Sequence, residues 1–311
     1  MVYFRAFGQV IRSELALPEF EPIAPGANTQ PDVHIVRAKL PPVPRDTRNA
    51  GFFRVANGAV EFEAEGIVRI RVAARDLIEV DVLDDAREAE ARLYVTGSGF
   101  GAWTFFAGRF PFHCGLVTIS NQDARSGTPV GLAITGPSGV GKSTLTTALV
   151  QRGLGFMSDD VVVLDSIENG EIGITPSFAR IKLWQDAADH FAIATGGLSR
   201  LHRDMEKFHV PFPQDSVIER ARLGAVFRLR FDDETDKVAC RRLPFPEALL
   251  ELRSNIYRLD LVPALGLEEK VFELVSAILQ QVPVFDLVRP RDYDRFDEAI
   301  DAILKEAEAL A

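Results

Sequence analysis

The sequence has little of several features that would place it in a specialised class of protein. Only two of its 311 residues are cysteines, Cys114 and Cys240, which is too few for a disulfide framework. We therefore expect a protein of the reducing cytoplasm. No apolar run reaches the roughly 18 residues that a membrane-spanning helix needs, and the N-terminal residues do not combine a basic segment with an apolar core. Neither membrane association nor a secretory signal is expected.

Positive charge is also scarce. Lysine and arginine number 35 against 45 acidic residues, which gives a formal net charge of −10 at pH 7. A negative surface repels phosphate backbones, so no nucleic acid is expected as the main partner, whereas a basic peptide or protein stays compatible. His190, His202 and His209 lack the cysteine spacing of a metal site, and we expect them to be structural. The length predicts two domains or one large one.

Against this background one segment stands out, because it follows the phosphate-binding pattern G-x-x-x-x-G-K-[ST]. Its glycines let the backbone turn with positive φ, so that backbone N–H groups form a concave anion site. The helix that follows adds partial positive charge, the lysine binds the β- and γ-phosphates, and the serine hydroxyl can hold Mg²⁺. The segment consists of Gly136, Pro137, Ser138, Gly139, Val140, Gly141, Lys142, Ser143 and Thr144.

The flanks of this loop have the order that a phosphate-binding loop requires. Residues 130–135 form a short, mostly apolar run typical of a buried strand. Residues 145–152 place apolar side chains at helical spacing, and Gly153 is a natural C-terminal stop. The sequence therefore predicts a strand, a loop and a helix that bind a nucleotide, with ATP and Mg²⁺ as the expected cofactors.

The rest of the chain predicts an α/β protein of two parts. Alternating segments between residues 3 and 72, separated by turn signals such as Asn57-Gly58, predict a smaller, mainly β unit over residues 1–90. Residues 91–108 predict a buried helix that leads into a second unit, residues 91–311, in which the nucleotide-binding part begins near residue 110. Strands are expected at 112–119, 156–165, 172–176 and 223–231, a loop at 120–129, and helices near 249–256, 271–279 and 296–304.

Two neighbouring acids, Asp159 and Asp160, follow the loop lysine at a distance of 17 and 18 residues. On extended chain they would face opposite ways, so a local bend is needed for one to reach the metal while the other accepts a proton from an attacking hydroxyl. The alternative is a solvated turn before a buried strand. His113 precedes the loop strand, and its residue type alone favours a core position over a functional one.

Three further cations are candidates for the same site. Arg180 and Lys182 would share one face of a strand, where they suit either nucleotide phosphates or a substrate carboxylate, or are ordinary surface charge. Lys207 could add a cation near the γ-phosphate. Trp184 could stack on a base, but a core or hinge role is favoured. Arg289-Pro290-Arg291 is expected to be a loop before the last helix.

Together, His113, the loop and the acid pair resemble the catalytic domain of the HPr kinase/phosphorylase family. The matching stretches are Phe112-His113-Cys114-Gly115, residues 136–143, Arg152-Gly153 and Ser158-Asp159-Asp160. The sequence differs at Thr144, where that family usually has an acid, and it lacks the family's later glycine-rich signature. These differences argue against phosphorylase activity and against HPr as the substrate.

The resemblance implies a fold related to phosphoenolpyruvate carboxykinase, with a mixed, largely antiparallel sheet, and transfer of the γ-phosphoryl group of ATP to a serine hydroxyl. By this resemblance Asp159 is the general base, Asp160 assists it or binds the metal with Ser143, Lys142 contacts the phosphates, and His113 contacts phosphate or substrate.

A looser resemblance covers more of the chain. Residues 3–8, Ser13-Glu14-Leu15-Ala16-Leu17-Pro18 and Arg180–Trp184 are similar to the HPr-kinase-like proteins that accompany lasso peptides and other ribosomal peptides. This implies a peptide or protein partner with an acceptor serine, and a homo-oligomer is possible. A small-molecule kinase acting on free serine or a sugar, and a nucleotide-gated sensor without transfer activity, are the alternatives.

Overall fold

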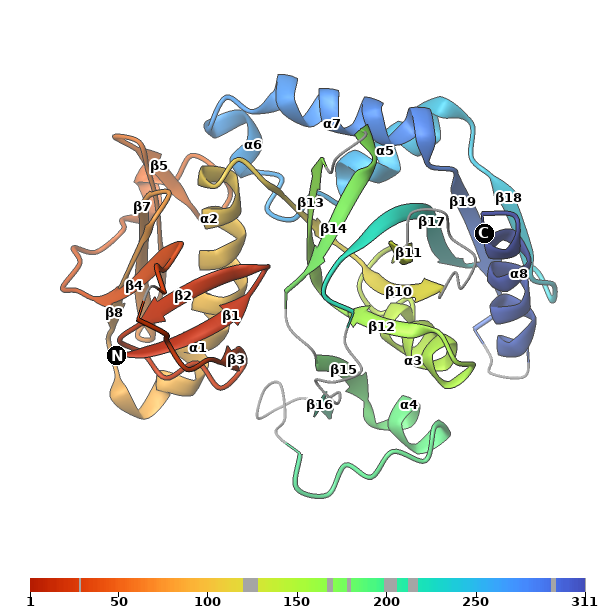
Figure 1. Cartoon of the computed structure of the whole chain (residues 1–311), viewed down its shortest axis with the longest axis horizontal. Coiled ribbons are helices and arrows are strands. Elements are labelled where there is room, and N and C mark those ends of the chain that lie inside the picture. Colours follow the sequence, from red (N-terminus) through yellow and green to blue (C-terminus); the bar gives the residue numbers. More distant parts are fainter. Residues whose placement is uncertain are drawn as a thin grey trace. The chain divides into compact units, whose positions relative to one another are not determined.

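The computed structural model describes the chain except for residues 28, 120–127, 167–169, 178–179, 199–205, 212–217, 292–294 and 311. Most of the loop expected at 120–129, and His202, therefore lie outside the described residues. The chain forms two compact units (Figure 1), the first made of residues 1–111 and 256–273, the second of residues 112–255 and 274–311.

The first unit contains a mixed sheet of eight strands in the order β3-β1-β2-β4-β8-β7-β6-β5. Strand β4 runs parallel to both β2 and β8, and the other neighbours are antiparallel. In β7, Val68, Ile70 and Val72 are buried and alternate with half-buried arginines, which is the pattern of a strand with one covered face. The strands are β1 (Val2–Ala6), β2 (Gln9–Ser13), β3 (Glu21–Pro22), β4 (Val33–Arg37), β5 (Arg54–Ala56), β6 (Ala59–Ala64), β7 (Val68–Ala74) and β8 (Leu77–Val82).

The helical segment expected at 91–108 is present, but it belongs to the first unit. Helices α1 (Glu88–Tyr94) and α2 (Phe100–Phe106) are joined by a π-helical stretch. Phe100 stacks on Phe7 with ring centroids 5.2 Å apart, and the Trp103 indole donates to the carbonyl of Arg75 at 2.5 Å. These contacts tie the segment to the first sheet, so the units divide after residue 111 rather than at the expected residue 90.

The second unit contains a mixed, largely antiparallel sheet. Its main strand order is β12-β10-β11-β17-β14-β13-β9. Strand β19 lies outside this order and pairs with both β17 and β18. Strand β17 runs parallel to its neighbours β11 and β19. The strands are β9 (Phe110–His113), β10 (Gly115–Ile119), β11 (Val130–Thr135), β12 (Gly155–Ser158), β13 (Val161–Ser166), β14 (Ile172–Pro176), β17 (Ala221–Phe231), β18 (Ala239–Arg242) and β19 (Val284–Arg289), and a separate hairpin pairs β15 (Arg180–Trp184) with β16 (Lys207–Pro211).

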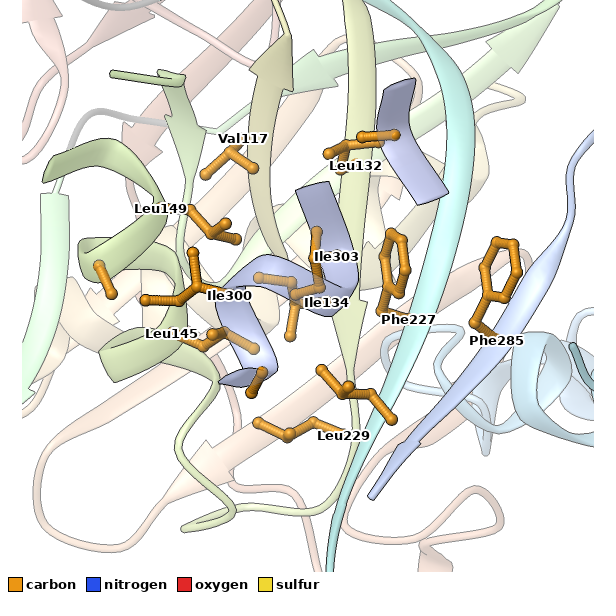
Figure 2. Packing of buried hydrophobic residues seen from close by; sticks show 14 of the residues in the cluster. Val117, Leu132, Ile134, Leu145, Leu149, Phe227, Leu229, Phe285, Ile300 and Ile303 are labelled. Carbon is orange, nitrogen blue, oxygen red and sulfur yellow. The ribbon is translucent and has the colours of Figure 1, made fainter. Parts of the chain in front are cut away.

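Helices α3 (Lys142–Gln151) and α8 (Phe296–Glu308) cover one face of this sheet through a buried apolar cluster (Figure 2). Apolar side chains at alternating positions of β11 and β17 meet a stripe of apolar side chains on each helix. The cluster includes Val117, Leu132, Ile134, Leu145, Leu149, Phe227, Leu229, Phe285, Ile300 and Ile303. This packing fixes α3, and with it the loop that precedes α3, on the end of β11.

The C-terminal third contains the three expected helices together with elements that the sequence did not reveal, namely α6, β18 and β19. The helices after α2 are α3 (Lys142–Gln151), α4 (Gln185–His190), α5 (Phe245–Ser254), α6 (Leu261–Ala264), α7 (Glu268–Gln281) and α8 (Phe296–Glu308). Among the described residues, no helix combines the length and the apolar character needed to cross a membrane.

The prediction of a single strand at 112–119 is wrong. The chain forms two strands there, β9 and β10, with Cys114 between them. The backbone N–H of Cys114 donates to the carbonyl of Asp160 at 3.1 Å, and that of His113 donates to the carbonyl of Asn255 at 2.8 Å. These bonds lead β9 and β10 to different partner strands and bring His113 beside the acid pair.

Candidate active site

The loop at 136–141 joins β11 to α3 and depends on glycine. Gly136 has a φ of +132° and Gly141 a φ of +95°, values that side chains with a Cβ rarely adopt. A Cβ at Gly136 would also lie 2.5 Å from the carbonyl oxygen of Leu229. The sequence therefore folds into the turn that a phosphate-binding loop requires.

Lys142 begins α3 and lies beneath the loop with 8% of its surface exposed. Its Nζ donates to the carbonyl oxygens of Gly136 at 2.8 Å and Pro137 at 3.2 Å. The loop thus curls around its own lysine, which places a full positive charge under the loop's backbone. This is the arrangement that binds nucleotide phosphates.

A cavity of about 420 Å³ opens over the loop, within the range of small-molecule sites. Most of the sequence-predicted residues share it. It is lined by His113, Ser138, Gly139, Gly141, Lys142, Ser143, Thr144, Asp159, Asp160, Lys182, Trp184, Asp186, Ala187, Phe231, Arg289 and Arg291.

The acid pair lies between β12 and β13, where the chain bends, so both carboxylates reach the cavity instead of facing opposite ways. Asp159 is 5% exposed, and its Oδ2 accepts from the backbone N–H of Lys182 at 2.8 Å. Its Oδ1 is buried and receives no hydrogen bond of regular geometry from the described residues. Burial raises the pKa of Asp159 to about 6, although the bond from Lys182 and the nearby Ser143 hydroxyl favour the charged form.

Asp160 behaves in the opposite way. Burial would raise its pKa, but the charge of Lys182 and the nearby His113 outweigh burial and hold the pKa well below the usual range. Lys182 Nζ lies 2.6 Å from Asp160 Oδ2, and His113 Nδ1 lies 3.4 Å from Asp160 Oδ1. The cavity therefore holds one carboxylate that is charged at all ordinary pH values and one that titrates near neutrality.

Strand β15 positions Lys182. Ile181 and Leu183 pack with Phe156 and Ala187 in a small apolar cluster, so the alternation of the strand leaves Lys182 and Trp184 to line the cavity. Trp184 is 45% exposed, so it does not occupy the core position that the sequence favoured.

Some of the expected residues of the loop and of the hairpin do not line the cavity with described side chains, and their roles in nucleotide binding stay predictions. Val140 is buried in the apolar cluster of the sheet, so its side chain does not face the cavity. Gly136 and Pro137 contribute carbonyl oxygens to Lys142 and do not line the cavity. Arg180 begins β15, and Lys207 lies opposite Trp184 in β16, but their side chains are outside the described part of the structure.

Phe231, Arg289 and Arg291 line the cavity, although the sequence did not indicate them. Phe231 ends β17 and Arg289 ends β19. Because these strands run parallel to β11, their carboxyl ends meet at the edge where the loop begins. The sequence could not indicate these residues because the order of the strands is not visible in it, and residues 289–291 by themselves have the pattern of a loop.

Mg²⁺ prefers oxygen ligands and is commonly held by one or two side chains together with substrate phosphates. The Ser143 hydroxyl and the two aspartates supply such oxygens around one cavity, so the donor set fits the ion. As a direct ligand, Asp160 Oδ2 would be contested by the Lys182 ammonium at 2.6 Å. Across the described residues, no cluster of three or more His, Cys, Asp or Glu side chains is placed to hold a metal without a nucleotide.

The known proteins that resemble this chain are found among solved structures. No family model matches the sequence, and no curated protein matches it. Among solved structures, the Hpr(Ser) kinase/phosphatase from Coxiella burnetii is similar over 64% of this chain and 90% of that chain, with 15% sequence identity and a TM-score of 0.33.

Proposed function

We propose that this protein is an ATP- and Mg²⁺-dependent kinase that transfers the γ-phosphoryl group to the serine hydroxyl of a peptide or protein. The observation that carries the proposal is that the loop lysine and the two aspartates line a single cavity. A nucleotide in the loop would present its terminal phosphate to these carboxylates, which is the arrangement needed for a hydroxyl to attack.

The roles follow from the local chemistry. Lys142 and the loop N–H groups bind the phosphates and offset the charge that develops on the transferred group. Asp159 accepts the proton of the attacking hydroxyl, because its pKa of about 6 lies near the operating pH, where a general base works best. Asp160 stays charged and holds Lys182 and His113 at the cavity. Mg²⁺, held at Ser143 and an aspartate, would neutralise phosphate charge.

The choice of a peptide acceptor is supported by one aromatic side chain at the cavity. Trp184 is a large, exposed aromatic side chain at the cavity, and such side chains often contact peptides. The relation to phosphoenolpyruvate carboxykinase, the link to lasso peptides, the homo-oligomer and the cytoplasmic location stay predictions from the sequence.

The proposal is tested by incubating the protein with Mg²⁺ and γ-labelled ATP, and with a library of serine-containing peptides or free L-serine. We expect the labelled phosphoryl group to appear on serine-containing peptides. Asp159→Asn should bind ATP as the wild type does but transfer about 10²–10⁴-fold more slowly, whereas Asp236→Asn, at an exposed position outside the cavity, should be unaffected. Label on free serine alone would reject the peptide acceptor, and ATP binding with no transfer to either would favour a sensor and reject the kinase.

A further inference from the structure

We infer that the guanidinium of Arg289 binds the diphosphate part of the nucleotide, as a second fixed cation beside Lys142. This inference rests on the proposed use of the cavity by a nucleotide, and it assigns a role to a residue for which the sequence predicts only a loop position. It follows from the place of Arg289 in the sheet, from how its side chain is held, and from its contact with the phosphate-binding loop.

The place of Arg289 is set by three parallel strands. Thr135, the last residue of β11, pairs with Arg228 of β17, and Phe231, the last residue of β17, pairs with Arg289 of β19. The three strands therefore end at one edge of the sheet, and the loop that binds phosphate starts at this edge. Ligands of α/β sheets bind outside the carboxyl ends of such strands.

The side chain of Arg289 is held in a fixed position. It is 4% exposed, and its guanidinium carbon lies 4.7 Å from the ring centre of Phe231 and 4.9 Å from that of Phe296. Its Nη1 also donates to the carbonyl of Pro290 at 3.1 Å. Aromatic rings attract a guanidinium through cation–π interactions and so help to fix its position. A charge that is already ordered loses little entropy when an anion binds.

The contact with the loop places this charge at the phosphates. A Cβ built on Gly141 would lie 3.0 Å from Arg289 Nη2, so the guanidinium lies against the backbone of the residue that precedes Lys142. The N–H groups of such loops bind the phosphates of the nucleotide. A guanidinium beside them can form paired hydrogen bonds with phosphate oxygens, which a lysine ammonium cannot.

The experiment measures binding and needs no acceptor. The affinities of the protein for ADP and for inorganic pyrophosphate are determined by calorimetry for the wild type, Arg289→Gln and Arg289→Lys. We expect Arg289→Gln to bind both ligands about 10- to 100-fold more weakly, as for the loss of charged hydrogen bonds. The affinities of Arg289→Lys should lie between those of the wild type and Arg289→Gln, because lysine keeps the charge but cannot form the paired hydrogen bonds. Arg242→Met, an exposed position outside the cavity, is the control and should bind both as the wild type does.

Pyrophosphate makes the test specific to phosphate. Equal loss of affinity for both ligands supports the inference, whereas loss for ADP alone would assign Arg289 to the nucleoside and overturn it. Unchanged affinities in a variant whose circular dichroism matches the wild type would also overturn it. If Arg289→Gln does not fold, Arg289→Lys decides by the same criteria. A wild type that binds neither ligand would reject the proposed function itself, which separates the two failures.

Discussion

Lys182 contacts both members of the acid pair, with its Nζ 2.6 Å from Oδ2 of Asp160 and its backbone N–H 2.8 Å from Oδ2 of Asp159. The two contacts have different effects. The ammonium helps to hold the pKa of Asp160 far below its usual range against the effect of burial, while the single backbone bond does not prevent burial from raising the pKa of Asp159 to about 6. Two adjacent carboxyl groups thus acquire separate proton affinities, which is the usual basis for separate acid–base roles.

The first prediction concerns the pH dependence of transfer. If Asp159 is the base, kcat/KM should rise with pH through an apparent pKa near 6, because the carboxyl must lose its proton before it can accept one. The rate of label transfer from γ-labelled ATP, measured between pH 5 and 8, checks this. A profile without this rise would remove Asp159 from the role of base.

The second prediction concerns stability at the same residue. A raised pKa means that the folded state favours the protonated carboxyl, so the stabilisation is full below the ordinary pKa of 3.8 and is lost as pH rises through about 6. Above about pH 6 the fold must hold a charged carboxylate in a buried position, and Asp159→Asn removes that charge. The substitution should therefore raise the free energy of unfolding at pH 7.5, by up to about 3 kcal/mol. The gain should largely vanish near pH 4.

Thermal unfolding of Asp159→Asn and of the exposed control Asp236→Asn at both pH values measures this effect. A variant that loses activity and gains stability would show that Asp159 is kept for function at a cost to the fold. A loss of stability at pH 7.5 would contradict the burial argument.

The third prediction concerns Lys182. Lys182→Met frees Asp160 Oδ2 from its ion pair, so a divalent ion no longer competes with the ammonium for that oxygen. We expect the Mg²⁺ concentration that half-saturates ADP binding to fall several-fold, while binding of ADP without Mg²⁺ weakens because one cation is lost from the cavity. Titrations with and without Mg²⁺ distinguish the two effects, and an unchanged Mg²⁺ requirement would argue against Asp160 as a ligand.

The fourth prediction concerns a buried ion cluster in the second sheet. Asp286 is fully buried in β19 and accepts from Arg228 Nε at 2.8 Å and from Arg230 Nη2 at 2.7 Å. Asp286→Ala leaves these arginines without their shared anion and should cost about 3–5 kcal/mol in the free energy of unfolding. Urea denaturation at pH 7 measures the loss, and a loss below about 1 kcal/mol would contradict it.

The same cluster predicts sensitivity to acid. Burial would raise the pKa of Asp286, but its bonds with Arg230 and Arg228 lower it to about 2. The stabilisation is therefore present above the ordinary pKa of 3.8 and is lost as pH falls toward 2. The wild type should lose stability over this range, and Asp286→Ala should lose less.

Local signals in the sequence explain what could be predicted. The turn at 136–141 needs its glycines, and the flanking strand and helix have simple apolar patterns, so the strand, loop and helix could be recognised without knowledge of the fold. The alternating strands of the first unit, including β1, β2, β6 and β7, were recognisable for the same reason.

Two of the missed strands, β8 and β19, share a physical cause. Strand β8 carries Asp81 and strand β19 carries Asp286, and both acids are buried. A buried acid disrupts the apolar pattern of a strand, and it is tolerated only because distant residues satisfy it. Lys39 and the backbone of Leu40 do so for Asp81, and arginines of β17 do so for Asp286. Such partners become visible only when the strands are assembled, as does the place of Arg289 at the cavity.

The first unit is discontinuous along the chain, and this affects how it can form. The Arg258 guanidinium lies 5.1 Å from the ring centre of Phe52, and its Nη2 lies 2.6 Å from the hydroxyl oxygen of Ser98. On the ribosome, residues 1–111 would wait for 144 intervening residues, 112–255, before residues 256–273 emerge to complete the unit. An isolated fragment of residues 1–111 would expose the aromatic surface that Arg258 covers, so it should aggregate unless the later segment is supplied as a separate peptide.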